Sequence, residues 1–158
     1  MKLTSLEEYG LRCLVELGRG GEGESVTIAE MSRREGISAP NVAKIMRVLR
    51  RAGLVKSTRG QAGGYVLARK PADIKVNEVL AALGGRIYDQ GFCDKHKGVV
   101  RLCTHLPDCS IRPVLRRVQE AVDQVLQALT LQSLLRSEAE VQASVVSPRA
   151  IFLPLHHS

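Results

Sequence analysis

The sequence predicts a mainly α-helical protein with one small β-hairpin, and three observations lead to this fold class. Apolar residues recur at helical spacing in the first 50 residues and again after residue 110. Two short strand-like runs flank a glycine-rich loop near residue 60. The length of 158 residues suits one small domain with a helical appendage.

Capping patterns locate the first two helices. Residues 4–19 form the first, and Thr4 with Glu7 has the spacing of a capping box, in which the two residues satisfy each other's free backbone N–H groups. A second box begins at Thr27 and opens a short helix that ends near Gly36.

The third helix has the clearest division into an apolar and a basic face. Ser38 caps it, Pro40 is tolerated in its first turn, and Gly53 ends it. We expect the buried stripe of this helix to consist of Val42, Ile45, Met46 and Leu49.

The hairpin follows directly. Residues 54–57 and 65–68 read as strands, and the basic, glycine-rich segment 58–64 between them predicts a protruding tip. A further helix over residues 76–83 is closed by Gly84.

Helix, short helix, tight turn, helix and hairpin follow one another in the order of a winged helix-turn-helix domain. We expect this domain over residues 1–85, a cysteine-containing loop over 86–109, a dimerisation helix over 110–136 and a weakly ordered tail over 137–158.

Charge is concentrated in one block of an otherwise neutral chain. The net charge is +7, but residues 31–70 hold ten Lys and Arg against one acid, Glu35. Such a block is typical of a polyanion binder, although a solvated surface is the alternative.

Aromatic residues make up 3% of the chain, which disfavours base stacking. No run resembles a membrane span or a secretory signal, so we expect a cytoplasmic protein.

This fold and charge predict binding to double-stranded DNA. The N-terminal turn of an exposed third helix can face base edges in the major groove, where Asn41 suits adenine and Lys44 suits guanine or phosphate. Arg59 at the hairpin tip can enter a minor groove or hold phosphate. The expected DNA-contacting residues are Ser38, Pro40, Asn41, Lys44, Arg47, Arg59, Gly60, Gly64 and Tyr65.

Three of the four cysteines, Cys93, Cys103 and Cys109, lie close together in the aperiodic segment before the last long helix. Three thiolates in one loop can converge on an iron–sulfur cluster or on zinc. A zinc site would add His96 as fourth ligand. A thiol switch without metal is a further alternative.

The last long helix carries an a/d pattern of apolar residues, which favours pairing with a second copy of the chain. The expected dimer interface is Leu115, Val118, Val122, Val125 and Leu129.

Several segments resemble the IscR/NsrR/RirA family of bacterial winged-helix regulators, which sense iron–sulfur status, nitric oxide or iron. The resemblance covers about residues 1–136. It rests on Met1-Lys-Leu-Thr4, Ile37-Ser38, Leu49-Arg-Arg-Ala-Gly-Leu-Val55, Arg59-Gly60, Gly63-Gly64-Tyr65 and Ile74-Lys-Val76. It implies a homodimer on a palindromic operator, with the three clustered cysteines holding an iron–sulfur cluster.

The resemblance also bears on the fourth ligand of that cluster. Arg112 stands where the cluster-assembly branch has a histidine ligand. Another branch pairs a glutamate of the first helix with a histidine one turn later, and Arg12 at that position disfavours this arrangement. The nitric-oxide-sensing branch uses a carboxylate of the partner subunit, at the position of Glu8 here. His96 and His105 are rival ligands. Three thiolates and one carboxylate favour a 4Fe–4S cluster, and a 2Fe–2S cluster is also allowed.

We therefore expect a homodimeric transcriptional regulator, most simply a repressor, whose operator affinity depends on a cluster that senses nitric oxide, redox state or iron. The alternative is a zinc-stabilised or thiol-switched regulator. No phosphate-binding loop, metal-hydrolase histidine pair or nucleophile elbow is present in the sequence, which argues against an enzyme and a small organic substrate.

Overall fold

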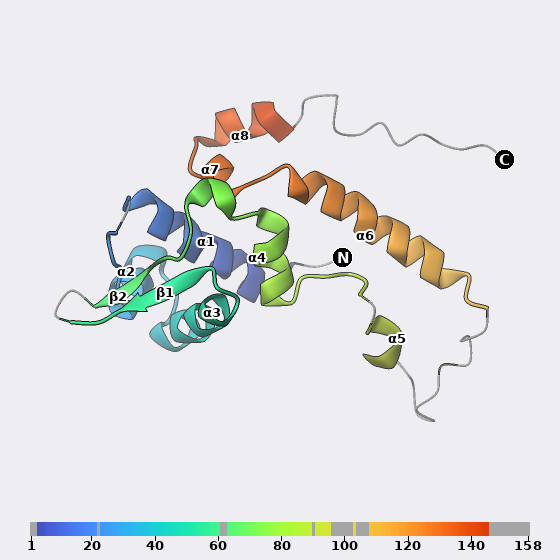
Figure 1. Cartoon of the computed structure of the whole chain (residues 1–158), viewed down its shortest axis with the longest axis horizontal. Coiled ribbons are helices and arrows are strands. Elements are labelled where there is room, and N and C mark those ends of the chain that lie inside the picture. Colours follow the sequence, from blue (N-terminus) through green and yellow to red (C-terminus); the bar gives the residue numbers. More distant parts are fainter. Residues whose placement is uncertain are drawn as a thin grey trace.

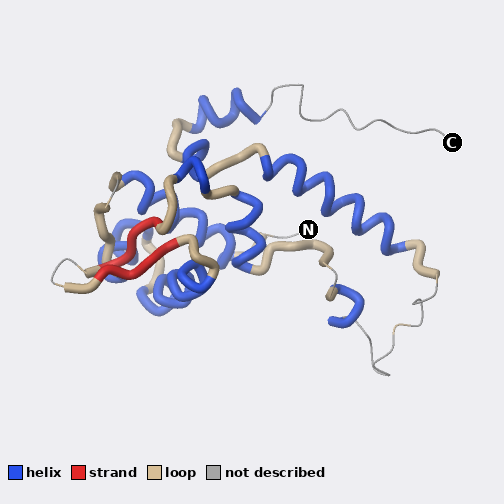
Figure 2. The backbone as a smooth tube through the Cα atoms, viewed as in Figure 1, coloured by secondary structure: helices blue, strands red, loops and turns tan. Residues whose placement is uncertain are grey.

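A computed structural model describes residues 3–21, 23–60, 63–89, 91–95, 103 and 108–145. It confirms the fold class: a mostly helical chain with one antiparallel two-stranded hairpin (Figures 1 and 2). The elements in order are α1 (Ser5–Arg19), α2 (Ile28–Glu35), α3 (Ala39–Arg51), β1 (Val55–Thr58), β2 (Gly64–Leu67), the 3-10 turn η1 (Pro71–Asp73), α4 (Val76–Leu83), α5 (Phe92–Lys95), α6 (Ile111–Gln127), α7 (Leu131–Leu134) and α8 (Glu138–Val145).

Helices α1 to α4 and the hairpin form one compact body, and α6 extends away from it (Figure 1). The C-terminal end of α6 lies beside α7, whereas its N-terminal end lies at the far side of the molecule (Figure 1). In the described part of the chain, no helix is long and apolar enough to cross a membrane.

The two predicted capping boxes are present. A Glu7 side-chain oxygen accepts hydrogen bonds from the backbone N–H and the hydroxyl of Thr4, at 2.6 and 2.8 Å. At α2, Glu30 accepts the same pair of bonds from Thr27, each at 2.9 Å, and these bonds hold the pKa of Glu30 below its usual value. The left-handed Gly36 ends α2, as the sequence predicts.

The buried face of α3 forms the centre of the core. All four residues of its predicted apolar stripe are buried, and Gly53 ends the helix with a φ of 70°. Ser38 occupies the N-cap position, but its side chain makes no capping hydrogen bond. Instead, the Ser32 hydroxyl donates to the carbonyl of Ile37 at 2.6 Å and secures the turn between α2 and α3.

The hairpin pairs Val55 with Leu67 at one end and Thr58 with Gly64 at the other. The strands lie within one residue of their predicted positions. A third segment joins them, because Val26 and Tyr65 form a backbone bridge that the sequence did not predict.

The region after α4 differs from the sequence prediction in three places. The expected helix over 110–136 is interrupted, since α6 ends at Gln127. The backbone turns away there to hydrogen-bond with the segment before α4: Val76 N–H donates to Leu129 at 3.0 Å, and Leu131 N–H donates to Ile74 at 2.8 Å. A helix cannot continue through residues whose backbone groups are committed to this pairing.

The other two differences are short helices. The one-turn helix α5 lies within the segment that lacked periodicity. Helix α8 occupies part of the tail that was expected to be weakly ordered, and Glu140 caps its start by accepting hydrogen bonds from the backbone N–H and hydroxyl of Ser137. The rest of that tail lies outside the described residues.

Candidate nucleic-acid interface and cysteine pocket

The exposed face of α3 carries the predicted base-reading residues. Asn41, Lys44 and Arg47 are all exposed, as are Ser38 and Pro40 at its start. The opposite face of α3 is fully buried, so the polar face is held rigidly towards solvent. A rigid, exposed helix after a tight turn is the element that helix-turn-helix proteins place in the major groove.

The hairpin divides the remaining predicted DNA contacts into two groups. Arg59 and Gly60 are exposed near its tip, where Gly60 has a φ of 107°. Gly64 and Tyr65 lie at the end of the ladder next to the tip and are only half-exposed, because the backbone of Val26 pairs with Tyr65 and lies against Gly64. The structure thus gives these two residues a part in fixing the hairpin. Residues 61 and 62 lie outside the described residues.

The exposed cations of α3 and the hairpin have no acidic partners among the described residues, unlike two arginines on α1 and α2. Arg12 and Arg34 each bind a glutamate, at 2.8 and 2.9 Å. No ion pair within the described chain involves the exposed cations of α3 and the hairpin, so their charge is directed to solvent. These cations are Lys44, Arg47, Arg50, Arg51, Lys56 and Arg59. Unpaired cations on one face produce the positive potential that attracts a polyanion.

The three clustered cysteines border one small pocket. Cys93 comes from α5, Cys109 lies two residues before α6, and Cys103 lies between them in the chain. The pocket has a volume of about 130 Å³, and its other lining residues are Tyr88, Phe92, Ile111, Arg112 and Leu115. The three cysteines are half-buried and form no disulfide. Among the residues that the structure describes, no three His, Cys, Asp or Glu side chains are close enough to form a metal site.

Glu8, the predicted fourth ligand, does not line this pocket in the single chain. Glu8 lies on α1 with 53% of its side chain exposed, and its carboxylate approaches Arg12 at 3.5 Å. Arg12 is held more firmly by Glu35, which raises the pKa of its guanidinium, and it lies 5.6 Å from the Tyr9 ring centre. The Glu8 carboxylate is therefore only loosely held in the single chain. His96 and His105 lie outside the described residues.

Cys13 is chemically distinct from the other three cysteines. It is completely buried in the core, and this burial raises the pKa of its thiol to about 12. A buried thiol of this kind is a packing residue.

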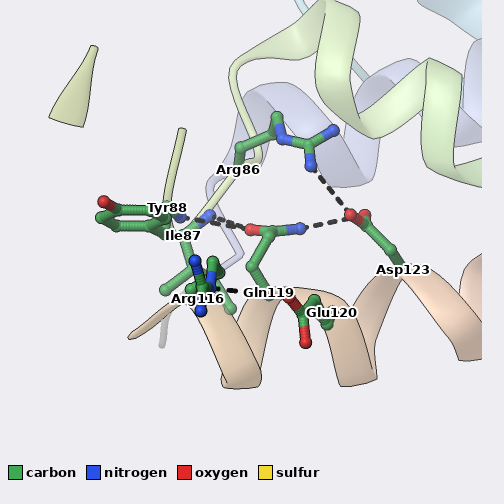
Figure 3. Close-up of polar contacts among 7 residues, drawn as sticks. All are labelled: Arg86, Ile87, Tyr88, Arg116, Gln119, Glu120 and Asp123. Atoms are coloured by element: carbon green, nitrogen blue, oxygen red, sulfur yellow. Dashed lines mark hydrogen bonds and ion pairs between the residues drawn. The ribbon is translucent and has the colours of Figure 1, made fainter. Parts of the chain in front are cut away.

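A buried glutamine, which the sequence patterns did not predict as a functional residue, links the cysteine segment to α6. Gln119 is 5% exposed, and its side-chain oxygen accepts hydrogen bonds from the backbone N–H groups of Ile87 and Tyr88 at 2.7 and 3.2 Å (Figure 3). Its amide donates to Asp123 at 3.0 Å, and Asp123 also pairs with Arg86 at 2.8 Å (Figure 3). The signal was a polar residue one turn after Leu115, at the edge of an apolar stripe.

The apolar face of α6 is exposed in the single chain. Ile111, Val114, Val118 and Val125 are 58%, 61%, 44% and 40% exposed. The predicted interface residues Leu115 and Val122 are half-buried, and Leu129 lies beyond the end of α6. The most exposed stripe therefore begins one turn earlier than predicted and passes through Val118 and Val125.

A helix-turn-helix unit with a basic hairpin and an exposed, unpaired cationic face defines a winged-helix DNA-binding protein. The chain belongs to the Rrf2 family, described as iron-dependent transcriptional regulators, whose sequence pattern matches residues 3–137. It is thus a DNA-binding transcriptional regulator, and its regulator relatives are not enzymes.

Known proteins resemble the chain over most of its length. Protein rrf2 of Nitratidesulfovibrio vulgaris is 35% identical over 152 residues, which cover 95% of this chain and 99% of that protein. The regulator NsrR of Geobacillus kaustophilus is 32% identical and covers 90% of this chain and 95% of its own length.

Two solved structures share the fold at 27% identity and a TM-score of 0.65. One is T. potens IscR, matched over 97% of this chain and 93% of its own. The other is CymR, the global cysteine regulator of B. subtilis, matched over 85% of this chain and 96% of its own.

Proposed function

We propose that the protein is a homodimeric regulator, acting as a repressor in the cytoplasm, whose affinity for a palindromic operator depends on an iron–sulfur cluster. The observation that carries this proposal is the pocket bordered by Cys93, Cys103 and Cys109. Support comes from the family, described as iron-dependent, and from relatives named NsrR and IscR.

The donor set of the pocket suits such a cluster. Thiolates are the ligands that iron–sulfur clusters take by preference, and the aromatic and apolar walls of the pocket limit access of water. The described side chains do not already form a ligand set, so loading the pocket requires the thiols to move closer together. When bound, the cluster would supply iron that reacts with nitric oxide, oxygen or reductants.

We assign the fourth ligand to Glu8 of the second subunit. Its carboxylate is exposed and only weakly engaged by Arg12, so it is free to turn towards a partner. A set of three thiolates and one carboxylate favours a 4Fe–4S cluster, with 2Fe–2S as the other form. The carboxylate would make one iron more labile than the rest.

The exposed stripe on α6 supports the homodimer. Four large apolar side chains along one helix are costly to leave in water, and a second α6 offers a matching surface. Two helix-turn-helix units in one dimer would read two half-sites of the operator. The centres of these half-sites would lie one helical turn of DNA, roughly 34 Å, or a whole multiple of it apart.

Cys109 couples the pocket to the dimer. Because it lies two residues before α6, drawing its thiol inward displaces the first turn of that helix. A shift of α6 changes the separation or tilt of the two α3 helices. Coupling of this type is usually worth about 1–3 kcal/mol, or roughly 5- to 150-fold in affinity.

The test is to purify the full chain without oxygen and to measure its visible absorption with its iron, sulfide and zinc content. The proposal expects a brown protein with iron and sulfide in equal amounts, whose affinity for a selected DNA duplex changes when the cluster is removed. A colourless protein that contains zinc and no sulfide would contradict it. Glu8→Ala should hold its iron less tightly, whereas Glu138→Ala, which removes another exposed acid, should not.

A thiol switch is the second candidate, because the three cysteines are free, half-buried and close to one pocket without a formed metal site. The similarity to the cysteine regulator CymR is compatible with it. The same preparation separates the two functions. Metal-free protein whose DNA affinity changes on mild oxidation, and returns on reduction, would establish the switch in place of the cluster.

A further inference from the structure

We propose that Gln119 is a positioning residue that couples the cysteine pocket to α6 and thereby to operator affinity. The inference rests on the proposed function, since it requires that the contents of the pocket control DNA binding. It adds a route within one subunit, separate from the covalent connection through Cys109.

The first step is the contact between Gln119 and the segment that leads into α5. One side-chain oxygen holds two successive backbone N–H groups, those of Ile87 and Tyr88 (Figure 3). The side chain is 5% exposed, so water does not readily replace a lost partner. Leaving a buried polar group without a partner is unfavourable, and Gln119 and this segment therefore tend to move together.

The second step links this segment to the cysteines. The ring of Tyr88 packs on that of Phe92, with 5.4 Å between the ring centres. Phe92 precedes Cys93 in α5, and both aromatic residues border the cysteine pocket. A movement of Cys93 towards the other thiols displaces Phe92 and Tyr88, and this displaces the backbone N–H groups that Gln119 holds.

The third step fixes Gln119 to its own helix. Its amide group donates to Asp123 one turn later, which is also held by Arg86 on the opposite side of the contact. Leu115, one turn earlier, borders the pocket itself. The middle of α6 is thus tied to the cysteine segment on the face adjoining its exposed apolar stripe.

The first test uses the unaltered protein and follows amide hydrogen exchange at Ile87 and Tyr88. One sample is reconstituted without oxygen with iron and sulfide, and the other is kept reduced and metal-free with a chelator. The proposal expects the two amides to exchange at least tenfold differently between these states. Equal exchange in both states would overturn it.

The second test uses Gln119→Met, which keeps the length of the side chain and removes both hydrogen-bonding functions. Gln124→Met is the matched control, because Gln124 is an exposed residue of the same helix. The readout is the ratio of dissociation constants for a selected DNA duplex between the loaded and metal-free states. We expect a wild-type ratio of roughly 5 to 150, a fall towards 1 in Gln119→Met, and no change in Gln124→Met.

A merely structural role would weaken or strengthen binding equally in both states and leave this ratio unchanged. A wild-type ratio above 5 that persists in Gln119→Met would overturn the coupling and leave the proposed function intact. A wild-type ratio of 1 would overturn the proposed function and the coupling together.

Discussion

Val26 and Tyr65 exchange both of their backbone hydrogen bonds, with N–O distances of 3.0 and 2.9 Å. Val26 directly precedes Thr27, the N-cap of α2, whereas Tyr65 lies in the second strand of the hairpin. The bridge therefore fixes the second strand, close to the tip of the hairpin, to the start of the helix-turn-helix unit. Arg59 and the exposed face of α3 are consequently presented to DNA as parts of one rigid body.

Gly64 makes this bridge possible, and its replacement is the first prediction. A Cβ atom at position 64 would lie 2.7 Å from the carbonyl oxygen of Val26. Gly64→Ala must push the hairpin away from Val26, and we expect a loss of about 1–3 kcal/mol in the free energy of unfolding, as for other overpacked sites. Urea denaturation measures this loss, and DNA affinity should fall as well. Ser57→Ala, at an exposed position of the same hairpin, should change neither; equal stability of the two variants would contradict the prediction.

Local signals explain why so much of the N-terminal fold could be predicted. The capping boxes at Thr4 and Thr27 depend on residues three apart, and Gly53 ends α3 through its own backbone conformation. The bridge between Val26 and Tyr65 has no such local signal, because it depends on residues distant in the sequence. The break after Gln127 was hidden for a similar reason, since the apolar repeat continues through it.

Arg59 is predicted to contribute to DNA binding through charge. It is exposed at the hairpin tip, and no ion pair joins it to the described part of the chain. Arg59→Ala should weaken DNA binding and reduce the slope of log K against log salt by about 0.9, the value for one phosphate contact. Fluorescence anisotropy over a range of salt concentrations measures the slope.

Arg136→Ala is the control for this measurement. Arg136 is also exposed and comes two residues after the end of α7, a helix that lies on the opposite side of the body from α3 (Figure 1). A slope that is unchanged in Arg59→Ala would show that the hairpin tip does not contact phosphate.

The four cysteines are predicted to differ in reactivity. Because burial raises the pKa of Cys13 to about 12, only about one in ten thousand of its thiols is ionised at pH 8. Metal-free, reduced protein should therefore react rapidly with Ellman's reagent at three thiols, and at the fourth only after unfolding. Cys13→Ala should leave the rapid phase unchanged. A fourth rapid thiol in the folded protein would contradict the burial of Cys13.

The site was less predictable than the fold. The spacing of the three cysteines indicated a shared centre, and the structure does place them around one pocket. The contact of Gln119 with Ile87 could not be expected, because it depends on how α6 packs. The helix that carries Cys93 is a single turn, too short to show an apolar repeat. The role of Glu8 concerns a second subunit, which the sequence of one chain describes only through resemblance.

The exposed stripe of α6 gives the last prediction, which concerns the dimer. Val118 lies in the middle of the stripe, and Val118→Asp would bury a carboxylate in the proposed interface. We expect the dimer dissociation constant to rise at least 100-fold, or by about 2.7 kcal/mol, with a matching loss of affinity for a two-half-site duplex. Sedimentation velocity across a concentration series measures the dissociation. Gln124→Asp places the same charge on an exposed position of the same helix and should remain dimeric. If Val118→Asp dimerises as tightly as this control, another surface must hold the two subunits together, and the route from the cysteine pocket to the paired α3 helices could not pass through this face of α6.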